Sequence, residues 1–190
     1  MIKSKTYHHQ DLRAALITEG LRQLESVGTD ISLRALAKSI EVSPTAPYRH
    51  FKDRSEFMGA LAAEGFHRFA EVLMVADEEP NPFAALRALG LAYLEFAQSH
   101  LALYRLMFSP YGHSLNSIAC KVAANRTLGA LVGAVARASE SGWKPGHAVM
   151  TLALAYWAAL HGWAVISGDR LIPPGVTEVS WGDLLAIYLS

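Results

Sequence analysis

Apolar residues recur at helical spacing along almost the whole chain. The first such stretch predicts a helix over residues 9–27, with Leu16 and Leu24 on its inward face and Gly28 as the stop signal. No stretch shows the sustained alternation of apolar and polar residues that marks a strand. The pattern therefore predicts an all-α protein. Further helices are expected over residues 54–76, 83–99, 100–108, 115–141, 145–167 and 181–189.

Between the first helix and residue 53 the pattern predicts two short helices. Ser32 can cap the first, because the apolar positions that follow it fall at helical spacing up to Ile40. Ser43 can cap the second, with Pro44 at its first position and an end near Phe51. Two short helices joined by a tight turn form a helix-turn-helix, although spacing alone equally allows a plain helical hairpin.

Charge is distributed unevenly, although Lys and Arg together equal Asp and Glu at 17 each. About nine of the basic and about six of the acidic residues lie at or before Arg54. After Arg54 the acidic residues outnumber the basic ones. A basic N-terminal segment suits an anionic partner, and a chance fluctuation of surface charge would look the same.

Enzymatic motifs are missing from the sequence. It contains no GxSxG nucleophile elbow, no GxxxxGK phosphate loop and no HExxH zinc motif. Glu64 and His67 have the ExxH spacing of di-iron bundles, but the second ExxH that such a site needs is missing. The single cysteine, Cys120, is expected to be a core residue in a cytoplasmic protein. No cofactor and no metal are expected.

A charge-free stretch over residues 148–167 has the length that would span a bilayer. It is rich in alanine and contains His161 and Gly162, and a buried central or dimer helix has the same composition. We therefore expect no membrane partner and, from the polar residues 1–9, no signal peptide.

The segment from Ser32 to Phe57, SLRALAKSIEVSPTAPYRHFKDRSEF, resembles the DNA-binding signature of the TetR family of transcriptional regulators. The start, Tyr7 to Arg13, and the late WAALHG from Trp157 to Gly162 look like the subgroup whose ligand domain is named for a Trp-His-Gly pattern. Two departures matter in the signature. Glu41 occupies a turn position where the family often has glycine, so it is expected to adopt positive φ, and Arg54 replaces the usual lysine.

This resemblance implies a helix-turn-helix domain over residues 1–53 that binds double-stranded DNA. Specific binding needs contacts to phosphates for register and contacts to bases for sequence. By resemblance Tyr48 and His50 contact phosphates, Thr45 and Arg49 approach the groove, and the remaining side chains neutralise backbone charge or cap helices. The predicted DNA-binding residues are Ser32, Arg34, Ser43, Thr45, Tyr48, Arg49, His50, Lys52 and Arg54.

For residues 54–190 the resemblance implies a helical domain that dimerises and encloses a small ligand. Such pockets are mostly apolar with a few polar groups that orient the guest, and His161, one turn beyond Trp157, is the best polar candidate. Arg105 and Arg126 are expected on solvated faces, which disfavours a strongly anionic guest. The predicted ligand-binding residues are Phe96, Tyr104, Met107, Trp157 and His161.

Together these observations predict a homodimeric, ligand-released repressor that is not an enzyme and binds a near-palindromic operator. The dimer interface is expected on the helix over 145–167 and the terminal helix over 181–189. Two alternatives remain: a helical carrier or enzyme that keeps the fold without binding DNA, and a membrane-associated protein.

Overall fold

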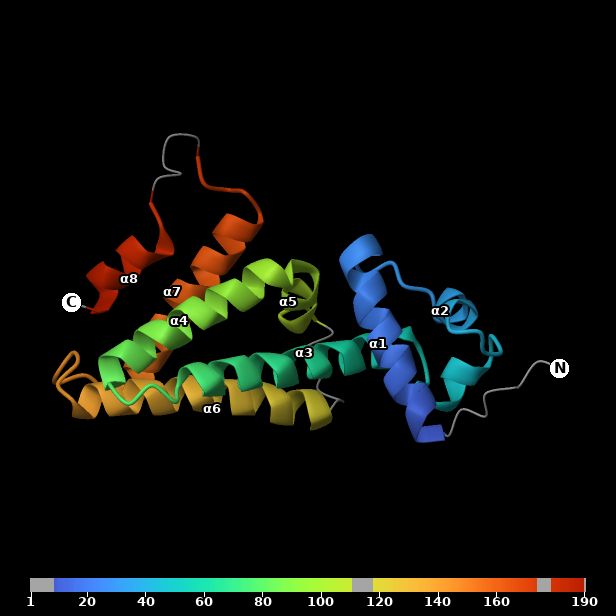
Figure 1. The fold of residues 1–190 in the computed structure, drawn as a ribbon, viewed down its shortest axis with the longest axis horizontal. Coiled ribbons are helices and arrows are strands. Elements are labelled where there is room, and N and C mark those ends of the chain that lie inside the picture. The colour runs from blue at the N-terminus through green and yellow to red at the C-terminus, as the bar shows by residue number, and fades with distance from the viewer. Residues whose placement is uncertain (1–8, 111–117, 174–178, 190) are drawn as a thin grey trace. The chain divides into compact units, whose positions relative to one another are not determined.

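The computed structural model describes residues 9–110, 118–173 and 179–189, and within them every regular element is helical (Figure 1). The all-α prediction is therefore confirmed. The elements, in chain order, are α1 (His9–Val27), α2 (Leu33–Ser39), the 3-10 helix η1 (Ala46–Arg49), α3 (Arg54–Ala76), α4 (Pro82–Ser99), α5 (Leu101–Met107), α6 (Ile118–Glu140), α7 (Val149–Gly168) and α8 (Trp181–Leu189).

The chain forms two compact units. The first comprises Met1–Gly65 and Ala102–Lys121, and the second comprises Phe66–Leu101 and Val122–Ser190. The predicted division after residue 53 concerns functional domains and stays a prediction.

In the first unit, α1, α2 and the start of α3 share one apolar core. Leu16, Leu36 and Phe57, one from each helix, are all buried. The close approach of α1 to α3 depends on Gly20, because a Cβ added there would lie 2.5 Å from Phe57 Cζ.

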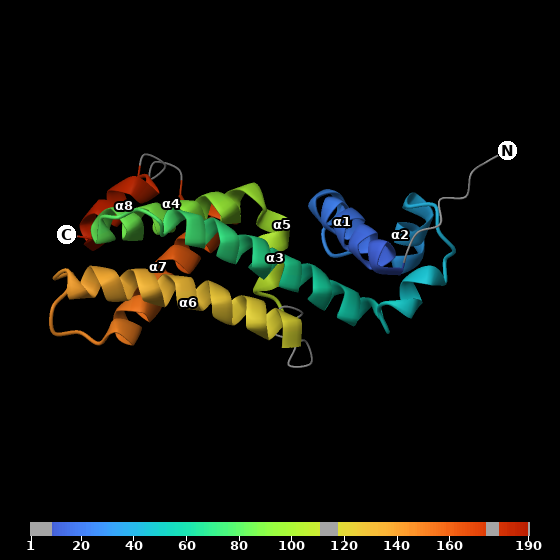
Figure 2. The same ribbon diagram turned by 60° about the horizontal axis from the view of Figure 1, so that its bottom comes forward.

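In the second unit, α4 packs against both α7 and α8 (Figures 1 and 2). The buried Tyr156 hydroxyl of α7 donates a 2.8 Å hydrogen bond to the Leu86 carbonyl of α4. Gly90, also on α4, leaves the space that this hydroxyl occupies. Also in this unit, Asp77, directly after α3, forms an ion pair with Arg137 of α6.

Two predicted helix bounds are wrong. The helix expected from residue 145 begins at Val149, because Lys144 (φ 46°) and Gly146 (φ 84°) form a turn that cannot belong to a right-handed helix. The helix expected over 44–51 is only the 3-10 turn η1. The buried Pro47 lies inside η1 and lacks the N–H that an α-helix would use at that position. The expected start of α6 at residues 115–117 lies outside the described residues.

Glu41 adopts the positive φ that the sequence predicts. Its φ is 60°, and the turn after α2 is closed by hydrogen bonds from Glu41 N to the Lys38 carbonyl and from Val42 N to the Ala37 carbonyl. Helices commonly end in this left-handed form, usually on glycine, because a Cβ raises its energy.

We expect Glu41→Gly to raise the free energy of unfolding by about 0.5–1 kcal/mol, since relief of the strain exceeds the entropy that glycine adds to the unfolded chain. Chemical denaturation measures the change. The control is Glu25→Gly, the same substitution at an exposed position in α1, which should lower stability by about 1 kcal/mol. Equal destabilisation by both variants would show that Glu41 is not strained.

Among the described helices, α6 and α7 are long and apolar enough to cross a membrane by length and composition. In each, 28% of the apolar stretch is buried within this chain. On α7 the exposed large apolar side chains are Met150, Leu154, Val165 and Ile166. Two such helices are weak evidence for a membrane protein, since helices of soluble proteins pass the same test.

Candidate DNA-reading surface and ligand site

The segment that follows α2 is short and held by local hydrogen bonds. The Ser43 hydroxyl lies 2.9 Å from Thr45 Oγ1 and also accepts from the Thr45 backbone N–H. Pro47 is the buried residue of η1, and its carbonyl accepts hydrogen bonds from the N–H groups of His50 and Phe51. These contacts leave Tyr48 and Arg49 exposed on the outer side of the turn.

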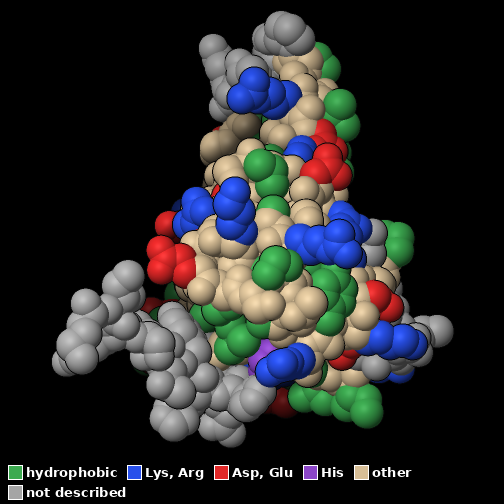
Figure 3. Space-filling model, turned by 90° about the vertical axis from the view of Figure 1, so that its right-hand side faces the viewer, with side chains coloured by type: hydrophobic (Ala, Val, Ile, Leu, Met, Phe, Trp, Pro, Cys, Tyr) green, Lys and Arg blue, Asp and Glu red, His purple; other side chains and the backbone are tan. Residues whose placement is uncertain are grey.

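Most of the predicted DNA-binding side chains are accessible. Only His50 and Arg54 are half-buried, and the Nε2 atom of His50 is shielded from solvent. Figure 3 shows Lys and Arg side chains in several groups on the face that is turned towards the viewer. The exposed predicted residues are Ser32, Arg34, Ser43, Thr45, Tyr48, Arg49 and Lys52.

Arg54, predicted to neutralise DNA backbone charge, binds the protein's own backbone. Its guanidinium donates hydrogen bonds to the carbonyls of Thr29 and Ile31, the second at 3.2 Å. Both carbonyls belong to the loop between α1 and α2. The guanidinium therefore ties the start of α3 to the loop that precedes α2, a role that the sequence pattern did not indicate.

A further cation that the sequence analysis missed lies beside η1. Arg13 of α1 is exposed, and its guanidinium carbon lies 5.3 Å from the centre of the buried Phe51 ring. Because Phe51 directly follows His50 in the chain, this places another positive charge next to the predicted DNA-binding segment. Arg13 and Phe51 are 38 positions apart in the sequence, so helical periodicity gives no sign of their contact.

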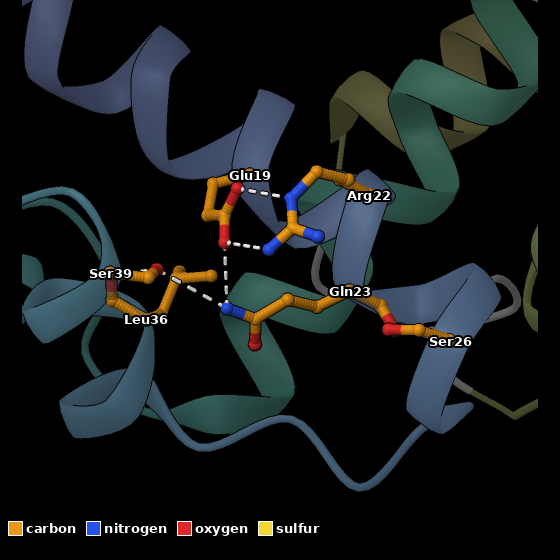
Figure 4. Close-up of polar contacts among 6 residues, drawn as sticks. All are labelled: Glu19, Arg22, Gln23, Ser26, Leu36 and Ser39. Atoms are coloured by element: carbon orange, nitrogen blue, oxygen red, sulfur yellow. Dashed lines mark hydrogen bonds and ion pairs between the residues drawn. The ribbon is translucent and has the colours of Figure 1, made fainter.

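Polar side chains join α1 to the last residue of α2 (Figure 4). The Glu19 carboxylate accepts hydrogen bonds from Arg22 and from Gln23, and Gln23 Nε2 also donates to Ser39 Oγ at 3.2 Å. The Arg22 and Gln23 hydrogen bonds lower the pKa of Glu19 to about 2. Glu19 therefore stays ionised, and the network holds the end of α2 in register with α1.

The predicted ligand residues Trp157 and His161 meet at a tyrosine that was not among them. Trp157 Nε1 donates a 3.2 Å hydrogen bond to Tyr93 Oη, which lies 3.4 Å from His161 Nδ1. Phe69 packs edge-on to the Tyr93 ring and stacks on Phe96, with ring centres 4.8 and 4.6 Å apart. The structure therefore brings three of the predicted residues, Phe96, Trp157 and His161, into one aromatic cluster of the second unit.

Tyr104 and Met107, the other two predicted ligand residues, lie on α5 in the first unit and are both buried. Met107 packs against Gly65, where an added Cβ would lie 2.8 Å from Met107 Cγ. Tyr104 contacts Phe108, with ring centres 4.8 Å apart.

Burial lowers the pKa of His161 below its ordinary value of 6.5, which favours the neutral ring. Arg105 and Arg126 are exposed, as predicted. Within the part of the chain that the structure describes, no three His, Cys, Asp or Glu side chains are grouped so that they could hold a metal ion.

Comparison with known proteins identifies the class. The family described as "Tetracyclin repressor-like, C-terminal domain" matches residues 86–181. The nucleoid occlusion factor SlmA of Marinomonas sp. (strain MWYL1) is 31% identical over 98 residues, and the chain spans about half the length of this curated relative.

Solved structures share the fold over nearly the whole chain. A protein of unknown function from Rhodococcus sp. RHA1 is 30% identical, with a TM-score of 0.83 over 97% of this chain and 94% of that one. AibR, solved in complex with isovaleryl coenzyme A and operator DNA, is 16% identical, with a TM-score of 0.64 over 93% of this chain and 95% of that one.

These matches, with the helix-turn-helix and the all-helical remainder, define the fold of a one-component transcriptional regulator. The chain belongs to the TetR family.

Proposed function

We propose that the protein is a homodimeric repressor that binds a near-palindromic operator and is released from it by a small, mostly apolar ligand. The observation that carries this proposal is the accessible set of polar and basic side chains around η1, on a helix-turn-helix held by the Glu19 network and by Arg54. The exposed Arg49 reads a base in the major groove, and the exposed Tyr48 contacts a phosphate. In this proposal Arg54 acts as a positioning residue.

The aromatic cluster around Tyr93 supports the ligand part of the proposal. It combines apolar ring faces with the few hydrogen-bonding groups that orient a guest in a pocket of this kind. The Trp157 and His161 of the cluster belong to the WAALHG segment, so we also propose membership of the Trp-His-Gly subgroup. AibR, which has the same fold, was solved with both an acyl coenzyme A and operator DNA.

The charge-free α7 supports the dimer. Its exposed apolar side chains form a face that a second copy would cover in a soluble, cytoplasmic protein. We propose that α7 and α8 form this interface. Ile187 is the most exposed large apolar residue of α8.

Selection of bound DNA from a random duplex pool tests the operator. We expect an inverted repeat with half-sites about one helical turn apart, and an affinity that falls steeply with salt. Arg49→Ala should cost about 1–3 kcal/mol and relax the preference at one position of each half-site. The control is Arg87→Ala, an exposed arginine on α4, which should leave both unchanged. A selected pool without an inverted repeat, or binding that ignores salt, contradicts the proposal and favours a carrier or enzyme that has kept only the fold.

A further inference from the structure

Arg13 of α1 is an exposed cation that lies over a buried aromatic ring. Its guanidinium carbon is 5.3 Å from the centre of the Phe51 ring. Within the described part of the chain, no carboxylate or carbonyl group accepts a hydrogen bond from it. An arginine can lie over a ring and still donate hydrogen bonds from the edge of its planar group. The N–H donors of Arg13 are therefore open to an anion from outside the chain.

The Phe51 ring is a firm support for this cation. It is 1% exposed and packs edge-on against Phe57, with ring centres 5.1 Å apart. The Phe51 N–H donates a hydrogen bond to the Pro47 carbonyl, which ties the residue to η1. The contact with this ring therefore holds the Arg13 guanidinium beside η1. A side chain that is already held in place loses less conformational entropy when it binds a partner.

The carboxylates nearest to Phe51 in the sequence are engaged with backbone N–H groups. Asp53 Oδ1 accepts a hydrogen bond from the Glu56 N–H at 2.9 Å, and Glu56 Oε2 accepts one from the Lys52 N–H at 2.6 Å. Both carboxylates lie at the start of α3, where unpaired N–H groups and the helix dipole favour negative charge. Among these described side chains neither carboxylate is paired with Arg13, so its charge remains available to another anion.

The place of Arg13 in the fold points to a DNA phosphate as that anion. His50 and Lys52, on either side of Phe51 in the chain, are both among the residues predicted to meet the DNA backbone. Side chains beside a recognition helix contact phosphates, whereas bases are read by the recognition helix itself. A guanidinium suits a phosphate because it can donate two parallel hydrogen bonds to it. Arg13 belongs to α1, so we expect it to contribute to affinity and register and not to sequence preference.

We propose that Arg13, supported by the Phe51 ring, donates hydrogen bonds to one backbone phosphate in each half-site of the operator. Phe51 is then a positioning residue for this contact. This inference rests on the DNA binding of the proposed function.

The dependence of affinity on salt tests the contact with the full chain. Arg13→Met keeps an unbranched side chain over Phe51 and removes the charge. It should weaken binding to the selected operator and to a scrambled duplex alike, by at least about tenfold. The slope of log affinity against log salt should fall by about 0.9 for each lost contact, or about 2 for the proposed dimer. Arg13→Lys should restore the slope and only part of the affinity. The control Arg87→Met removes the same charge from an exposed position on α4 and should change neither.

Operators with neutral phosphates identify the partner of Arg13. Each phosphate of a half-site is replaced in turn by a methylphosphonate, and affinity is measured by fluorescence anisotropy. One replacement should weaken the wild type about tenfold and Arg13→Met hardly at all, because that variant has already lost the contact. Phe51→Leu tests the supporting ring, with circular dichroism as a check on folding. It should weaken DNA binding of the wild type by about threefold and have no effect in the Arg13→Met background.

The possible results separate this inference from the proposed function. If Arg13→Met binds both duplexes with the wild-type affinity and slope, the phosphate contact is refuted while the operator stands. A changed sequence preference with an unchanged slope would make Arg13 a base contact instead and would also overturn the proposal. Equal losses from Phe51→Leu in both backgrounds would refute the positioning role of the ring. If the wild type binds neither duplex, the proposed function fails, and the role of Arg13 fails with it.

Discussion

Gly90→Ala is expected to lower the free energy of unfolding by about 3 kcal/mol. A Cβ at this position would overlap the Tyr156 hydroxyl oxygen and lie 3.2 Å from Tyr156 Cζ and 3.5 Å from Leu160 Cδ2. All of these side-chain atoms are buried between α4 and α7. Overpacking costs about 1–3 kcal/mol, and displacement of the hydroxyl from the Leu86 carbonyl adds about 1 kcal/mol.

Thermal and chemical unfolding at one fixed protein concentration measure this loss, because dimerisation would couple stability to concentration. Gly129→Ala on α6 is the control. An added Cβ there meets nothing within 4 Å, so the variant should be more stable by about 0.5–1 kcal/mol. In a Tyr156→Phe background Gly90→Ala should cost at least about 1.5 kcal/mol less, since the overlapping oxygen is gone. Additive effects of the two substitutions would show that the contact with Tyr156 is not the cause.

Leu154→Glu is expected to convert the proposed dimer into a folded monomer. Leu154 lies on the exposed face of α7 and is 45% exposed in the single chain. A two-fold interface on this face would bury two unpaired carboxylates, one from each subunit, at several kcal/mol each. The dissociation constant should therefore rise by more than about a thousandfold.

Sedimentation at micromolar concentration measures the change, and circular dichroism checks that the helices persist. The control is Leu91→Glu on α4, where the leucine is 44% exposed and outside the proposed interface. It should leave the dimer intact. If Leu154→Glu still sediments as a dimer, α7 is not the interface. If both variants dissociate, the interface extends to α4.

Most of the helices could be predicted because their signals are local. Both ends of α1 and of α8 were found from apolar spacing, and Gly28 marked the end of α1. The errors come from backbone geometry that residue type leaves open. Pro145 suits a first helical turn, but the positive φ of Gly146 delays α7 to Val149.

In the candidate sites, too, the features with a local sequence signal could be predicted and those that depend on tertiary contacts could not. The exposure of Tyr48 and Arg49 followed from the helix-turn-helix pattern and the resemblance. The link from Trp157 to Tyr93 joins residues 64 positions apart, and Tyr93 in isolation has the spacing of an ordinary core residue. The contact of Arg54 with Thr29 and Ile31 likewise depends on how α3 meets a distant loop. Such tertiary hydrogen bonds leave no periodic trace in the sequence.

The single cysteine makes the proposed dimer accessible to distance measurement. Cys120 is buried, and burial raises the pKa of its thiol, so little of the reactive thiolate forms at neutral pH. A nitroxide maleimide should therefore spare the native residue and modify a cysteine placed at the exposed Ser55, a nearly isosteric change. In a dimer every molecule then carries two spin labels, one on each DNA-reading head. Pulsed dipolar spectroscopy can record the separation of the heads with and without ligand or operator, in a protein whose native thiol has not been removed.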